Sequence, residues 1–118
     1  MSSFTERLIV SKLDKKFWTV ERKFTYHVGD EDSIEFITVP FGFITDFASV
    51  PRIFWSVLPP DGEYTQAAVL HDYMYNEKLY ERKICDDIFL EAMTVLKVPG
   101  WKRRIIYYAV RMFGGFCF

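Results

Sequence analysis

Cysteine is scarce in this chain of 118 residues, which contains only Cys85 and Cys117. Two cysteines are too few for a disulfide scaffold, so we expect two buried thiols and no bridge. Long apolar runs are also missing, because the longest candidate, residues 105–110, is far shorter than the ~20 residues that a membrane span needs. Residues 1–12 include charged side chains and lack the apolar core of a signal peptide. These absences predict a cytoplasmic protein without a membrane span.

The composition is otherwise that of a folded protein, with 50% hydrophobic and 26% charged residues. We find no repeats, linkers or low-complexity tracts, so residues 1–118 are expected to form a single domain with a core of its own. Aromatic residues are abundant at 19% of the chain. Such bulky rings either dominate a core or form an exposed adhesive face, and we favour the core.

Residues 1–46 have the pattern of β-strands. Residues 8–10 are short and apolar, and residues 17–28 and 34–39 alternate between apolar and polar side chains. The polar segment 29–33 separates the two longer runs, and Pro40 with Gly42 ends the last one. This half is predicted to be an antiparallel β-meander.

Residues 49–115 have mainly helical periodicity. A short helix is predicted over 52–58, followed by longer helices over 63–78, 81–96 and 101–113. Pro and Gly residues separate the first from the second and the third from the fourth, whereas Leu79-Tyr80 joins the second to the third. Strands followed by helices are typical of the α+β class. The predicted fold is therefore an N-terminal meander packed against a C-terminal bundle of three to four helices.

A polar cluster lies on two of the predicted helices. His71 and Tyr75 share one helix face at spacing i, i+4, with Asp72 beside them, and Asp86 and Asp87 follow on the next helix. Because the connection between these helices is short, they are expected to be antiparallel neighbours, with His71 near Asp86 or Asp87. A carboxylate bonded to one imidazole nitrogen leaves the other able to take a proton from water. Asp72 is then available to bind a cation.

A purely structural interpretation of the same residues stays open. His71 and Asp86 are also consistent with a buried hydrogen bond that joins two helices. Asp87 pairs equally well with Lys83, and Arg82 with Asp86, as surface ion pairs at spacing i, i+4.

A second polar site interrupts the apolar segment between the strands and the helices. Asp46, next to Thr45, either turns the chain through bonds to backbone amides or projects toward His71 and Asp72. Arg52 is a candidate partner for Asp46 or for another carboxylate.

Charge is distributed unevenly along the chain. Residues 1–91 contain ten basic and sixteen acidic residues, whereas residues 92–118 contain five basic and no acidic residues. The candidate partner or anion surface comprises Lys102, Arg103, Arg104 and Arg111. These side chains either meet an external anion or lie against the acidic remainder of the chain, and we favour the second.

Two motifs resemble a known family. The run from Pro40 to Arg52, which contains Thr-Asp-Phe-Ala-Ser-Val-Pro-Arg, and the run Ala-Ala-Val-Leu-His-Asp-Tyr-Met-Tyr at residues 67–75 resemble small phage and bacterial proteins classified as domain of unknown function 1353. The similarity extends over about residues 36–113. It implies a phage or prophage origin, with synthesis in the host cytoplasm or incorporation into a virion, and no established activity.

His71-Asp72-Tyr73-Met74-Tyr75 with Asp86 and Asp87 is also similar to the paired active-site helices of A2-class phospholipases. That resemblance implies His71 as base, Asp72 as a calcium ligand, and Asp86 as the residue that orients the base, with Tyr75 bonded to it. Asp46 is a second candidate ligand for calcium or another divalent cation. The disulfides that join the two helices in those enzymes have no counterpart, because only Cys85 lies on either helix.

These observations leave two main functional hypotheses. The first is a small hydrolase, metal-assisted in one form, that acts on a lipid ester or a cell-envelope bond through His71 and Asp86. The second is a non-catalytic virion, assembly or lysis component that binds another phage protein. Nucleic-acid binding is a weaker hypothesis, because the chain is slightly acidic and has no known reading motif.

Overall fold

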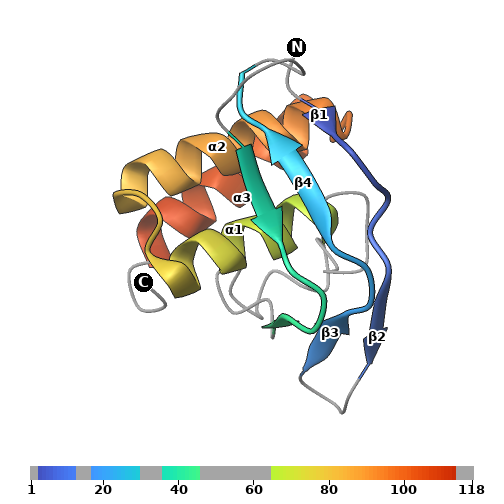
Figure 1. Ribbon diagram of the computed structural model, residues 1–118. Helices are drawn as coiled ribbons and strands as arrows, with labels where there is room; N and C mark the ends of the chain where they lie inside the picture. Colours follow the sequence, from blue (N-terminus) through green and yellow to red (C-terminus); the bar gives the residue numbers. More distant parts are fainter. Residues whose placement is uncertain (1–2, 13–16, 30–35, 46–64, 114–118) are drawn as a thin grey trace. The chain divides into compact units, whose positions relative to one another are not determined.

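The computed structural model describes residues 3–12, 17–29, 36–45 and 65–113 and divides the chain into two compact units (Figure 1). The first unit, Met1–Asp46, contains antiparallel strands, and the second, Phe47–Phe118, contains three helices in its described part. The predicted α+β class is therefore confirmed. The helix predicted over 52–58, which begins at Arg52, lies outside the described residues. Asp46 and Cys117 lie outside them as well.

The described residues of the first unit form short strands in two sheets. The strands are β1 (Ser3–Phe4), β2 (Val10–Lys12), β3 (Trp18–Val20), β4 (Phe24–His27), β5 (Phe36–Val39) and β6 (Ile44–Thr45). One sheet has the order β1-β4-β5 and the other has the order β2-β3-β6, and every pairing is antiparallel. The strands are thus antiparallel as predicted but do not follow one another in one meander.

The split into two sheets has a local cause. Residues 21–23 are three exposed charged side chains in succession, so they interrupt the alternation of the run predicted over 17–28. The chain bends there and leaves β3 for β4, which belongs to the other sheet. After β5 the chain passes through Gly42 and returns to the sheet that contains β3. Gly42 has a backbone conformation (φ +87°) that L side chains rarely adopt. The Gly42 N–H then donates to the Val20 carbonyl at 2.8 Å.

The β4–β5 pair shows how alternation selects a buried face. Tyr26 is opposite Ile37 and Phe24 is opposite Val39, and all four side chains are buried. On the other face, the hydroxyls of the paired Thr25 and Thr38 lie 2.9 Å apart. Side-chain period two therefore gives this pair one apolar face and one polar face.

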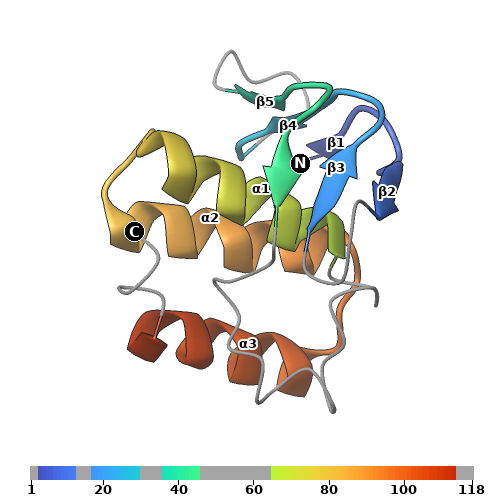
Figure 2. The ribbon, with the colours of Figure 1, turned by 90° about the horizontal axis from the view of Figure 1, so that it is seen from below.

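The second unit contains α1 (Thr65–Glu77), α2 (Arg82–Val95) and α3 (Gly100–Phe113), close to the predicted helix boundaries. Helix α2 lies between α1 and α3 (Figure 2). The fully buried large side chains of these helices are Leu70, His71, Met74, Phe89, Met93 and Ile106. None of the helices in the described ranges is long and apolar enough to cross a membrane.

Helices α1 and α2 end in the same way. Lys78 (φ +50°), the first residue after α1, and Lys97 (φ +62°), the second residue after α2, adopt the left-handed conformation. In each case the next residue donates its N–H back to a helix carbonyl: Leu79 to Met74 at 3.2 Å, and Val98 to Met93 at 3.0 Å. These are Schellman motifs, which close a helix and reverse the chain abruptly. The first of them lets residues 78–81 connect α1 to its neighbour α2.

Candidate active site

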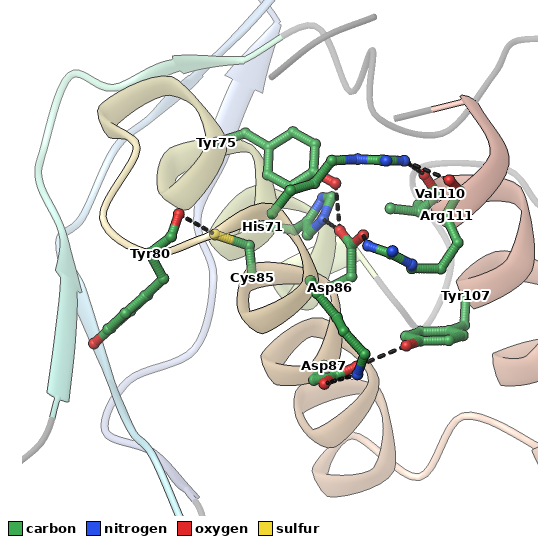
Figure 3. Close-up of polar contacts among 11 residues, drawn as sticks. His71, Tyr75, Tyr80, Cys85, Asp86, Asp87, Tyr107, Val110 and Arg111 are labelled. Atoms are coloured by element: carbon green, nitrogen blue, oxygen red, sulfur yellow. Dashed lines mark hydrogen bonds and ion pairs between the residues drawn. The ribbon is translucent and has the colours of Figure 1, made fainter. Parts of the chain in front are cut away.

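The centre of the candidate site is a contact between α1 and α2. His71 Nε2 lies 2.7 Å from Asp86 Oδ1, and neither side chain has any exposed surface (Figure 3). Of the two carboxylates predicted to approach His71, Asp86 makes the contact. The predicted antiparallel pairing of the two helices accounts for it, because it brings these residues together across the interface between α1 and α2.

The imidazole ring is held on two sides. Tyr75, one turn beyond His71, donates its hydroxyl to the same Asp86 oxygen, and its ring centroid lies 4.1 Å from that of His71. Phe89 of α2 stacks on His71 with centroids 4.5 Å apart and an interplanar angle of 28°. Packing and hydrogen bonding together therefore fix the orientation of His71.

A third helix completes the cluster. Arg111 of α3 places Nη1 2.7 Å from Asp86 Oδ2, the oxygen that His71 and Tyr75 leave unused. Burial raises the pKa of the Asp86 carboxyl, but the hydrogen bonds from His71, Tyr75 and Arg111 outweigh it and hold that pKa below its usual value. Asp86 is accordingly a buried carboxylate. The pKa of Tyr75 is raised by burial and by its bond to this carboxylate, so Tyr75 is a neutral donor.

The charge of Asp86 determines the tautomer of His71. An ionised carboxylate only accepts hydrogen bonds, so we assign the imidazole proton to Nε2. In the neutral form of the ring, Nδ1 then carries a lone pair. This atom is buried and has no hydrogen-bond partner among the residues that the structure describes. The ring is thus held in a fixed orientation, and its Nδ1 atom is unused within those residues.

Asp87 belongs to a separate and more exposed network. It lies 2.8 Å from Lys83 Nζ and accepts a hydrogen bond from the Tyr107 hydroxyl at 2.6 Å. Both contacts lower the pKa of Asp87, with Lys83 the larger cause. The bond to Asp87, together with partial burial, raises the pKa of Tyr107 to about 12. Asp87 therefore forms the surface pair with Lys83 that the sequence offered as an alternative.

Arg82 makes contacts that differ from the pair with Asp86 that the sequence offered. Its Nη2 donates to the backbone carbonyls of Val110, at 2.9 Å, and of Arg111. Arg82 thus satisfies carbonyls at the end of α3, which otherwise have no partner within the helix. Since Arg111 lies in that last turn, Arg82 helps to hold it beside Asp86.

The other predicted residues divide between the two units. Thr45 is buried in β6, within the first unit. Asp72 is partly exposed on α1. Within the described ranges no group of three or more His, Cys, Asp or Glu side chains is arranged to hold a metal ion. The described residues therefore supply one of the two expected metal ligands, Asp72, and the other, Asp46, lies outside them.

The predicted basic surface is not one continuous patch. Arg111 turns inward to Asp86, and Arg103 donates to the Val98 carbonyl at 2.8 Å. Lys102 places Nζ 5.7 Å from the centre of the Trp101 ring, and Arg104 is exposed. The sequence also missed Tyr107, although its spacing of four residues from Arg111 indicates that both lie on one face of α3.

Comparison with known proteins adds a family but no activity. A family model described as "Protein of unknown function (DUF1353)" matches residues 18–110. An uncharacterized protein, y4jT, from Sinorhizobium fredii (strain NBRC 101917 / NGR234) is 38% identical over 78 residues, which are 64% of this chain. The match spans only 23% of that relative's length. No solved structure matches the chain.

Proposed function

This chain belongs to the DUF1353 family, whose description assigns no reaction, and we propose from the helical cluster that it is a small hydrolase with His71 as general base. The proposed substrate is a lipid ester or another bond of the cell envelope. That choice comes from the similarity of the His71 and Asp86 helices to those of A2-class phospholipases.

One observation carries the proposal: His71 Nδ1 is a buried, oriented acceptor without a hydrogen-bond partner in the described part of the chain. A histidine that served only to join helices gains stability from bonds at both ring nitrogens, and a buried polar atom left unpaired is costly. Unsatisfied buried groups are common where a substrate or a reacting water binds. This supports a role for Nδ1 in moving a proton.

The chemistry assigned to the site is water attack on an ester carbonyl. His71 Nδ1 removes a proton from water as its oxygen bonds to the carbonyl carbon, and the imidazolium is stabilised by the Asp86 carboxylate 2.7 Å away. When the tetrahedral intermediate collapses, the C–O bond to the alcohol breaks and Nδ1 returns the proton to the leaving oxygen. Tyr75 and Arg111 position Asp86 throughout.

A divalent cation is a separate part of the proposal. When bound, such an ion stabilises a developing oxyanion. Asp72 on α1 is the residue proposed to hold it, but the described residues do not complete a ligand set, so the proton transfers assigned to His71 do not depend on a metal.

The hydrolase proposal is tested by a matched pair of variants at neighbouring carboxylates. We expect two single variants, Asp86→Asn and His71→Ala, each to abolish hydrolysis of a phospholipid and of a simple aryl ester. Asp87→Asn, which alters the exposed network, should retain it. Circular dichroism checks that each variant is folded. Equal activity in all the variants, or no hydrolysis by the wild-type protein, would reject the role of His71.

The cation is tested by thermal unfolding with calcium, magnesium, zinc or a chelator. An ion that binds only the folded state adds about 2.7 kcal/mol at a hundred times its dissociation constant, a shift that is readily measured in a domain of this size. We expect Asp72→Asn to remove the shift, whereas Asp87→Asn should preserve it. If no ion shifted the midpoint of thermal unfolding, the cation would be rejected, and the proposed chemistry of His71 would proceed without a metal.

A second candidate function is favoured by the complete burial of His71 and Asp86. Asp86 joins side chains from all three helices, which is also what a structural centre requires. In this proposal the chain is a non-catalytic virion, assembly or lysis component of a phage or prophage and acts through a protein partner. It predicts that His71→Ala fails to fold, and that charge reversal at Arg103 and Arg104 weakens co-purification with a phage protein.

A further inference from the structure

Among the described residues, helix α3 has one buried apolar face and one exposed apolar face. Ile106, Ala109 and Val110 are buried. On the adjoining side of the helix four large apolar side chains are exposed: Trp101 (57%), Ile105 (41%), Tyr108 (62%) and Met112 (72%). Their spacing of four, three and four residues places them along one line of the helix. We call these four residues the α3 stripe.

The stripe has cations at both edges. At 100° per residue, Arg104 lies on one side of it and Lys102 on the other, and α3 contains no acidic residue. Arg104 is exposed, and Lys102 lies beside the Trp101 ring. The other two cations of the helix, Arg103 and Arg111, make the inward contacts described above. The exposed face is therefore apolar and aromatic along its centre and positive along its edges.

This charge pattern selects among the surfaces that could cover the stripe. A second copy of the chain would bring the Lys102 and Arg104 edges together with the same edges of its partner, and like charges at those positions oppose pairing. An anionic surface instead complements both edges. Tryptophan and tyrosine are the aromatic residues enriched at membrane–water interfaces, where flanking lysine and arginine reach the headgroups.

We propose that the α3 stripe docks on an anionic lipid surface, with the helix axis parallel to that surface. Trp101, Ile105, Tyr108 and Met112 enter the boundary between headgroups and acyl chains, and Lys102 and Arg104 contact lipid phosphates. The docking is peripheral, in keeping with helices that are too short to span a bilayer within the described ranges. It rests on α3 alone and does not depend on the proposed hydrolysis.

Vesicle sedimentation tests this directly. The full chain is mixed with vesicles of phosphatidylcholine or of an equimolar mixture of phosphatidylcholine and phosphatidylglycerol. We expect binding to the mixed vesicles, weaker binding to phosphatidylcholine, and release at high salt because exposed charges are screened. No binding to the mixed vesicles, or equal binding to both compositions, would overturn the proposal.

Matched variants locate the docking face. Ile105→Asp should weaken binding about tenfold or more, because it replaces a membrane-inserted apolar side chain with a charge. Ile84→Asp makes the same change at an isoleucine of α2 with similar exposure, 44%, and should bind normally. Arg104→Glu should weaken binding about fivefold or more, whereas Lys23→Glu, an equal change of charge in the first unit, should not. Equal effects within either pair would reject α3 as the docking face.

Light scattering supplies the remaining control. We expect the wild-type chain to be monomeric without vesicles. A dimer that Ile105→Asp dissociates would instead show that the stripe is an interface between two copies, and would overturn lipid docking.

Discussion

Asp86 is the residue at which the three described helices of the second unit meet. His71 and Tyr75 of α1 bond to one of its oxygens, and Arg111 of α3 pairs with the other. A buried charge is tolerated only when such partners satisfy it, and removing one member of the set leaves the others unpaired. The same contacts that stabilise the carboxylate fix the proton on His71 Nε2. Stability and the proposed base chemistry therefore depend on one side chain.

The buried Asp86 carboxylate stabilises the folded chain at neutral pH. We expect Asp86→Asn to lower the free energy of unfolding by about 3–5 kcal/mol, because it leaves buried donors without a charged acceptor. Asp87→Asn should cost about 1 kcal/mol or less, because Asp87 and Lys83 are largely exposed and such pairs contribute little. Urea denaturation of the three proteins measures both effects. If both variants lost similar amounts of unfolding free energy, Asp86 would be no more important for stability than Asp87.

The pH dependence follows from the direction of the Asp86 shift. The folded state holds the pKa of this carboxyl below its ordinary value, so the stabilisation is fully present above that ordinary value, ~3.9. It is lost as the pH falls through the lower pKa of the folded state. The difference in unfolding free energy between wild type and Asp86→Asn should therefore narrow in acid. A difference that stays constant down to acid pH would show that Asp86 gains no stability from being ionised.

At the scale of the elements, the ends of α1 and α2 show how the helices are brought together. Both end in a left-handed lysine and a Schellman motif, where glycine is the more usual residue. The sequence therefore carries no glycine signal at Lys78 or Lys97. The helix boundaries were predictable because apolar periodicity ends at the same points.

This conformation predicts that Lys97→Gly stabilises the protein by up to about 1 kcal/mol, because glycine adopts a positive φ without the strain of a Cβ atom. Lys83→Gly, in the interior of α2, should instead destabilise by about 1 kcal/mol. Thermal unfolding of the two variants compares them directly. If Lys97→Gly were as destabilising as Lys83→Gly, the left-handed conformation at the end of α2 would be refuted.

At the scale of the whole molecule, the described part of the chain is held by packing and polar contacts and contains no disulfide. Cys85 is free and buried, and its thiol lies 3.6 Å from the Tyr80 carbonyl. Burial raises the pKa of this thiol, which keeps it protonated and weakly reactive.

We therefore expect the midpoint of thermal unfolding to be the same with and without a reducing agent. Cys85→Ser provides the control, because it removes the buried thiol whatever the redox conditions. A midpoint that falls on reduction in the wild-type chain alone would reveal a bridge through Cys85 and contradict the sequence prediction of two thiols.

The sequence by itself determined the features that depend on neighbours along the chain. The three described helices follow from apolar periodicity, with Val98-Pro99-Gly100 as the predicted break between the last two, and their predicted ends differ from the observed ones by a few residues. The approach of His71 to one of two carboxylates, Asp86 or Asp87, follows from the short connection between the two helices. Both are consequences of helix geometry, which is local and regular.

Only the tertiary structure decided which distant partners these residues take. Several cations could have paired with Asp86, and Arg111 does so because α3 packs on α2. Arg82 instead binds carbonyls at the end of α3, and Tyr107 donates to Asp87. The strands were likewise assigned to two sheets by pairings far apart in sequence, such as β1 with β4. Such choices depend on which side chains meet when elements pack, and no local period encodes that.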